Sequence, residues 1–114
     1  MADKKISMLY TKKGEMVVLY TNKKMKTDAD VAQKTLGEAR NVLALSEEWT
    51  NENLFAELKS LAETLGVKNG QILYPLRIAL SGKETTPGGA TEIAVILGKD
   101  ETLKRIDAAI KKLS

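Results

Sequence analysis

Residues 49–66, WTNENLFAELKSLAETLG, predict one helix with a signal at each end. Thr50 can accept a hydrogen bond from a free amide of the first turn, and Trp49 and Leu54 flank it at the spacing of a hydrophobic staple. Gly66 supplies the left-handed residue at which helices commonly end. The apolar residues between these ends recur at helical spacing and predict one buried face: Leu54, Phe55, Leu58, Leu61, Ala62 and Leu65. We therefore expect Trp49 and Phe55 to be core anchors and not base-stacking platforms.

Helical spacing continues on both sides of this segment. The capping-box-like residues 27–30, TDAD, begin a predicted helix over about residues 28–45. On the other side a helix is predicted over residues 70–80, closed by Gly82. Pro75 lies inside it and removes one backbone hydrogen bond, so we expect this helix to bend or split.

Two further helices complete the expected fold. Thr86-Pro87 combines a hydroxyl cap with a proline at the first helical position, and predicts a helix that ends at Gly98. The last helix begins near Asp100, and its apolar stripe contains Leu103, Ile106, Ala109, Ile110 and Leu113. Five helices joined by short turns predict a compact all-α domain over residues 27–114, in a chain whose 114 residues fit one domain.

The N-terminal segment, residues 1–26, has a different character. It holds seven lysines against Asp3 and Glu15, a net charge of +5 that leaves −2 for residues 27–114 out of the total of +3. Such an imbalance suits contact with phosphate, although lysine-rich termini are more often simply solvated. Strand-forming residues 6–10 and 16–20 flank a polar connection containing Gly14, and predict a short β-hairpin.

Several function classes are disfavoured by what the sequence lacks. The chain has no histidine and no cysteine, which removes most nucleophile–base pairs and most zinc sites. The carboxylate pairs Glu47-Glu48 and Asp100-Glu101 are sequence neighbours, which do not face each other on a helix. No phosphate-binding glycine loop is recognisable. We therefore expect no catalytic residue, no metal site and no bound cofactor.

The expected cellular location follows from two segments that are not found in the sequence. No run of about 18 apolar residues could cross a bilayer, and the N-terminus lacks the cleavage site of a signal peptide. We expect a cytoplasmic monomer that does not enter a membrane.

Ordered sequence blocks in the C-terminal half carry a family resemblance. These are GVKNG at 66–70, PLRIALSG at 75–82, TPGG at 86–89, ILGK at 96–99 and LKRI at 103–106. Their order and spacing resemble the C-terminal anticodon-binding domain of bacterial glutamyl-tRNA synthetases, discriminating and non-discriminating forms alike. KKMKT at 23–27 and Trp49-Thr50 also resemble that family, so the similarity covers roughly residues 20–114.

The resemblance implies recognition of tRNA without catalysis. In that family this region is a helical cage that receives the anticodon loop, and glutamate activation takes place in a separate catalytic domain. The implied partners are tRNA(Glu), tRNA(Gln) if the parent enzyme is non-discriminating, and that catalytic domain.

The matching positions imply an RNA-binding site. Arg77 corresponds to an arginine that contacts anticodon bases, and Thr86 and Pro87 lie in a turn against the same nucleotides. Gly88 and Gly89 would let RNA approach the backbone closely. Gly89 stands where some family members carry a larger apolar residue.

Alternatives to this site remain open from the residues alone. Arg77 could be a half-buried surface arginine paired with a carboxylate such as Glu92, and Thr86-Pro87 could be an ordinary helix cap. At the level of function, the alternative is a stand-alone helical adaptor that docks on a protein partner, through strand addition to its N-terminal hairpin.

Overall fold

The computed structural model describes residue 20, residues 27–83 and residues 86–113. Apart from Tyr20, the predicted β-hairpin lies outside these residues, so it stays a prediction. The predicted division of the chain into a basic segment, residues 1–26, and a helical domain also stays a prediction. Tyr20 is buried, and its carbonyl oxygen accepts a hydrogen bond of 2.7 Å from the Thr27 hydroxyl.

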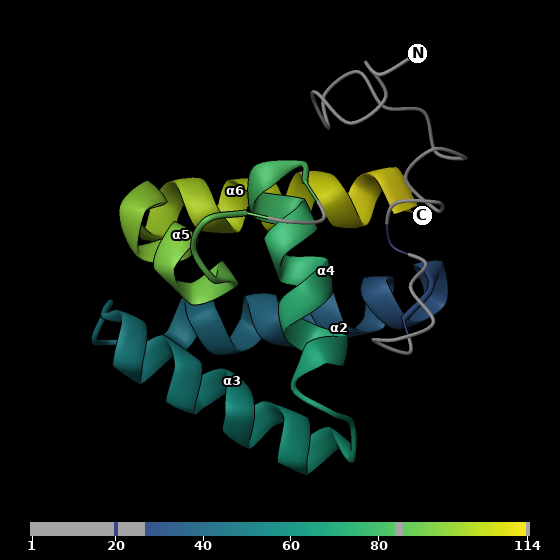
Figure 1. Cartoon of the computed structure of the whole chain (residues 1–114), viewed down its shortest axis with the longest axis horizontal. Coiled ribbons are helices and arrows are strands. Elements are labelled where there is room, and N and C mark those ends of the chain that lie inside the picture. Colours follow the sequence, from purple (N-terminus) through teal and green to yellow (C-terminus); the bar gives the residue numbers. More distant parts are fainter. Residues whose placement is uncertain (1–19, 21–26, 84–85, 114) are drawn as a thin grey trace.

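The described residues form five helices, which confirms the predicted all-α fold. They are α2 (Ala29–Leu45), α3 (Asn51–Leu65), α4 (Gly70–Ser81), α5 (Ala90–Leu97) and α6 (Lys99–Leu113). Figure 1 shows α2 and α6 running along the long axis of the molecule, with α4 crossing both. The helix α3 packs along α2, and the short α5 packs against α3, α4 and α6. Among these helices none is long and apolar enough to cross a membrane.

Most helix ends lie where the sequence places them. The amide of Val31 donates to the Asp28 carboxylate at 2.9 Å at the start of α2, and the amide of Asn53 donates to the Thr50 hydroxyl at 3.2 Å at the start of α3. Gly66 and Gly82 have φ angles of 71° and 75° and end α3 and α4. These are left-handed conformations that a side chain would strain, so glycine is the residue that lets both helices end there.

The sequence predicts that Pro75 bends or splits the third helix, and of these two outcomes the split is wrong, because α4 is continuous from Gly70 to Ser81. Pro75 is buried together with its neighbours Tyr74 and Leu76. A proline in a helix interior removes one hydrogen bond and crowds the carbonyl group four residues earlier, a loss of about 3 kcal/mol. The burial of this apolar stretch against the core offsets that loss, so the helix continues through it.

The prediction that Phe55 is a core anchor is also wrong, since 42% of its surface is exposed. The side of α3 that faces the core contains Leu54, Leu58 and Ala62, all of them almost fully buried. Successive residues of a helix are separated by about 100°, so Phe55 points away from the direction of Leu54 and lies at the edge of the buried face.

Trp49 is partly buried and packs against the core, which confirms its expected role as an anchor. Its indole nitrogen Nε1 donates a hydrogen bond of 2.9 Å to the carbonyl oxygen of Ala94 in α5. The same oxygen accepts the amide of Gly98 at 2.9 Å and the hydroxyl of Thr102 in α6 at 3.2 Å. One carbonyl group therefore connects α5 to the segment before α3 and to α6.

We expect Trp49→Phe to lower the free energy of unfolding by about 1 kcal/mol, because the aromatic packing is largely kept and one partly buried hydrogen bond is lost. Urea denaturation followed by circular dichroism measures the change. The control is Leu45→Ala at a side chain that is 82% exposed, which should stay within about 0.5 kcal/mol of the wild type. Equal stability of the Trp49→Phe variant and the wild type would show that the bond to Ala94 contributes nothing.

Candidate nucleic-acid interface

Arg77 lies near the C-terminal end of α4, half-buried, with its Nε atom inside the protein surface. Hydrogen bonds hold the last turn of α4 in place around it. The hydroxyl of Ser81 donates to the Arg77 carbonyl at 2.6 Å, and the amide of Gly82 donates to the Ile78 carbonyl at 2.7 Å. The backbone that carries the guanidinium is therefore fixed, and the side chain as a whole is half-buried, with its Nε atom covered.

A second arginine fastens the end of α4 to α6. Arg105 Nη1 donates to the carbonyl oxygen of Leu80 at 2.7 Å, and its Nε donates to Glu101 at 2.8 Å. A cation suits the negative end of a helix. The hydrogen bond from Arg105 also lowers the pKa of the Glu101 carboxyl below its usual value. The Glu101–Arg105 spacing on one helix could have been found from the sequence, whereas the contact with Leu80 could not.

The turn before α5 consists of Thr86, Pro87, Gly88 and Gly89, and we call it the 86–89 turn. Pro87 is exposed and the other three residues are half-buried. The hydroxyl of Thr86 donates to the carbonyl oxygen of Gly88, so this turn is closed by a bond within itself. The backbone of the 86–89 turn is therefore polar and accessible.

The prediction that Thr86-Pro87 opens the fourth helix is wrong. The helix α5 begins at Ala90, and its N-cap is Gly89. The Glu92 carboxylate accepts a hydrogen bond of 3.0 Å from the Gly89 amide, as the third residue of a capping box does. Because the Thr86 hydroxyl is already bonded to Gly88, it does not cap α5. The spacing of Gly89 and Glu92 is the signal in the sequence that indicates this helix start.

The corrected helix start changes the electrostatics expected of the turn. Glu92 places a carboxylate in the first turn of α5, where it stabilises the positive end of the helix dipole. A second anion close to that carboxylate would be repelled. The 86–89 turn therefore suits a neutral group, such as a base edge or a ribose hydroxyl, better than a phosphate.

The glycines of the turn are not required by backbone conformation. Gly89 has φ −75° and ψ 168°, an extended conformation that any residue adopts. A Cβ atom added at Gly88 or Gly89 would meet its nearest neighbour, a Glu92 atom, at 3.5 Å, which is ordinary van der Waals contact. A Cβ atom would therefore fit at Gly89, and its absence leaves the backbone of the turn open to a ligand.

The predicted site residues lie on connected elements. Arg77 is on α4, and the 86–89 turn leads into α5, which packs against α4. Figure 1 shows the chain before α5 lying beside α4 as it leads into the start of α5. The two parts of the predicted site are thus joined by both the chain and the packing.

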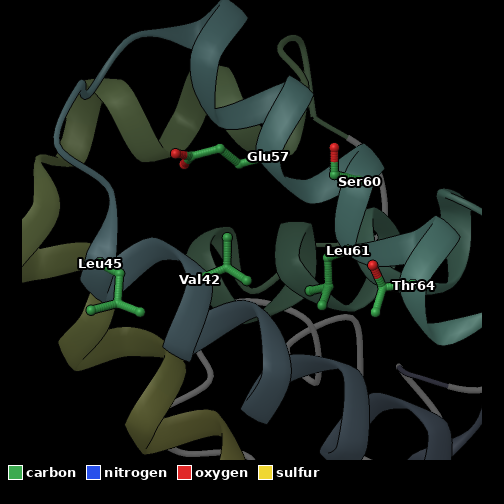
Figure 2. Close-up of a pocket in the computed structure, with 6 residues that line it drawn as sticks. All are labelled: Val42, Leu45, Glu57, Ser60, Leu61 and Thr64. Atoms are coloured by element: carbon green, nitrogen blue, oxygen red, sulfur yellow. The ribbon is translucent and has the colours of Figure 1, made fainter.

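A groove elsewhere on the surface contains none of the predicted residues. It lies between α2 and α3 and is lined by Val42, Leu45, Glu57, Ser60, Leu61 and Thr64 (Figure 2). Among the side chains that the structure describes, Glu57 has no hydrogen-bond partner for its buried Oε1 atom. A carboxylate in this position disfavours an RNA backbone, so we do not assign the groove to nucleic acid.

Comparisons with known proteins agree on one family. Residues 4–110 match the family model described as an anticodon binding domain. The glutamate–tRNA ligase of Clostridium acetobutylicum is 46% identical over 97 residues, which cover 85% of this chain and 20% of that protein. Those of Clostridium tetani and Clostridium botulinum are 48% and 50% identical over 95 residues, which cover 83% of this chain and 20% of each protein. The aligned part of the chain thus spans about a fifth of the length of these relatives.

We expect Glu92→Ala to lower the free energy of unfolding by about 1 kcal/mol, because the Gly89 amide loses its acceptor and the dipole of α5 loses its carboxylate. Thermal unfolding followed by circular dichroism measures this change. Glu92→Gln should retain most of the stability, since its amide oxygen can still accept the bond. The matched control is Glu38→Ala at an exposed position of α2. A loss as large as that of Glu92→Ala in this control would contradict a specific capping role.

Proposed function

Because the chain belongs to the anticodon binding domain family, we propose that it recognises the anticodon loop of tRNA(Glu) and carries no catalytic centre of its own. The observation that carries the proposal is the position of Arg77 on α4, next to a helix whose start is preceded by an open polar turn. A planar cation and an accessible backbone on adjoining elements suit the unpaired bases of an RNA loop.

Arg77 has the chemistry that this role needs. A guanidinium can stack on the face of one base while its N–H groups donate to the edge of another. Such a role is favoured because Arg77 is half-buried and because the hydrogen bonds of Ser81 and Gly82 hold the backbone around it. The reach of the arginine is then limited, and a limited reach helps to discriminate between bases.

The 86–89 turn would hold the same nucleotides from the α5 side. Gly88 and Gly89 add no side chain, so a base or ribose can come close to the backbone there. Glu92 lies immediately behind the turn and disfavours phosphate, which orients a bound nucleotide with its base toward the protein. Thr86 and Pro87 would then contact the base or sugar.

The choice of tRNA depends in part on Gly89. A larger apolar residue at this position could pack on a base and restrict which base is accepted. Glycine has no side chain to restrict the base, so tRNA(Gln) is a second ligand of this site if the parent enzyme is non-discriminating. In the same proposal the ligase chemistry belongs to a separate catalytic domain, because the aligned region covers a fifth of the related ligases.

We expect Arg77→Ala to weaken binding of tRNA(Glu) by about 1 to 3 kcal/mol and to reduce its preference over an unrelated tRNA. Nitrocellulose filter binding of both tRNAs to both proteins at one fixed salt concentration measures the effect. Arg77→Lys keeps the charge but loses the planar stacking group, so it should resemble the alanine variant in specificity.

The matched control is Lys104→Ala, which removes one exposed cation from α6. It should leave the preference for tRNA(Glu) unchanged. Equal and weak binding of both tRNAs by the wild type and by Arg77→Ala would rule out the proposed function. An adaptor that docks on a protein would give that result.

A further inference from the structure

Phe55 is the only phenylalanine of the chain, and 42% of its surface is exposed. The other large apolar side chains exposed among the described residues are Leu45 and Ile96. Leu45 lines the groove between α2 and α3 shown in Figure 2. Ile96 lies at the C-terminal end of α5, away from the helix start. Phe55 differs from both because it lies on α3 one helical turn from Asn51, which is hydrogen-bonded to the first turn of α5.

The proximity follows from a hydrogen bond between α3 and α5. The hydroxyl of Thr91 donates to the side-chain oxygen Oδ1 of Asn51 at 2.5 Å. Thr91 is in the first turn of α5, two residues after Gly89, and Asn51 is the first residue of α3. Phe55 follows Asn51 by four residues, a spacing that places two side chains on the same face of a helix. The ring is thus one helical turn from the residue that ties α3 to the start of α5.

The direction of Phe55 on α3 agrees with this placement. The groove against α2 is lined by Glu57, Ser60, Leu61 and Thr64, which mark one flank of α3. Counted at about 100° per residue around the core-facing Leu58, Phe55 falls on the opposite flank. That flank is on the same side as Asn51, which contacts α5. Phe55 is therefore on the α5 side of α3 and not on the side of the groove against α2.

We propose that Phe55 is a stacking platform for an unpaired base of the RNA loop bound at the 86–89 turn. The proposal rests on the proposed function, since it extends that site by one nucleotide across α5 onto α3. An aromatic ring stacks on the face of any base, so this contact supplies affinity and position without selecting a sequence.

Charges near Phe55 indicate that a base and not a phosphate approaches it. Glu52 and Glu63 are exposed on this side of α3, and Lys59 is the exposed cation there. Glu52 and Lys59, three and four residues from Phe55, carry opposite charges and Glu63 lies a further turn away, so this flank has no excess of positive charge that would attract a phosphate to the ring. An uncharged base face needs no such charge to approach the exposed ring. The contact should therefore be insensitive to salt, unlike phosphate contacts.

A single phenylalanine makes the contact directly observable. The whole chain is labelled with ¹³C at the phenylalanine ring, and the ring signals are followed by NMR as a stem-loop RNA with the anticodon arm sequence of tRNA(Glu) is added. Stacking on a base should move the ring proton signals upfield in step with binding. A fully paired duplex of the same stem is the control RNA, and it should leave the signals unchanged.

Affinity measurements test the same contact in a second way. We expect Phe55→Ala to weaken binding of the stem-loop by about fivefold or more, with no change in the salt dependence. Phe55→Tyr keeps a stacking ring and should bind like the wild type, whereas Phe55→Leu keeps an apolar side chain and should bind like the alanine variant. Ile96→Ala is the matched control at another exposed apolar residue, and circular dichroism checks that each variant is folded.

The outcomes separate this inference from the proposed function. If the wild type binds the stem-loop and Arg77→Ala weakens binding, but the ring signals do not move and Phe55→Ala binds normally, the stacking platform is wrong and the anticodon site stands. If the wild type does not bind the stem-loop, both are wrong. Equal binding by the leucine and tyrosine variants would also overturn the platform, because it would show that apolar contact and not stacking matters.

Discussion

The position of the candidate site depends on the carbonyl oxygen of Ala94. It accepts the indole N–H of Trp49, the amide of Gly98 and the hydroxyl of Thr102. A helix as short as α5 is not stable by itself in water, so it exists because its neighbours hold it. The Ala94 contacts hold its C-terminal half between the segment before α3 and the start of α6. The Asn51–Thr91 bond holds its N-terminal turn. With both ends fixed, the 86–89 turn has a defined place beside α4.

Local signals in the sequence were sufficient for most of the fold, and they failed where two signals competed or where distant contacts decided. Caps at Asp28 and Thr50 and the glycines 66 and 82 set helix ends within a residue or two of the prediction. Before α5, Thr86-Pro87 and the Gly89–Glu92 spacing both predict a helix start, and the second prevails because the Thr86 hydroxyl bonds within the turn. Propensity alone does not rank two such caps.

The exposure of Phe55 shows a second limit of sequence patterns. Leu54 and Phe55 are adjacent apolar residues, and helical spacing admits either of them to the buried face. Contacts between residues far apart in the chain decide which of the two is buried. One of them is the hydrogen bond that joins the first turn of α3 to Thr91. The predicted site has the same character. Arg77 and the 86–89 turn were identified through a family resemblance, and the bonds that fix them, such as Arg105 to Leu80, connect different helices.

Charge distribution explains why the helical part should select bases more than it attracts RNA in general. Residues 27–114 have a net charge of −2, and carboxylates stand at the start of α5, along α3 and in the groove beside α2. General attraction to a polyanion needs an excess of positive charge, which this part of the sequence does not have. The contacts proposed for it are made by a guanidinium, an open backbone and an aromatic ring, and all three suit bases. A nucleotide that cannot leave its stack gains little from such a surface. Unpaired loop bases can leave their stack, so under the proposed function this surface would distinguish a loop from a duplex.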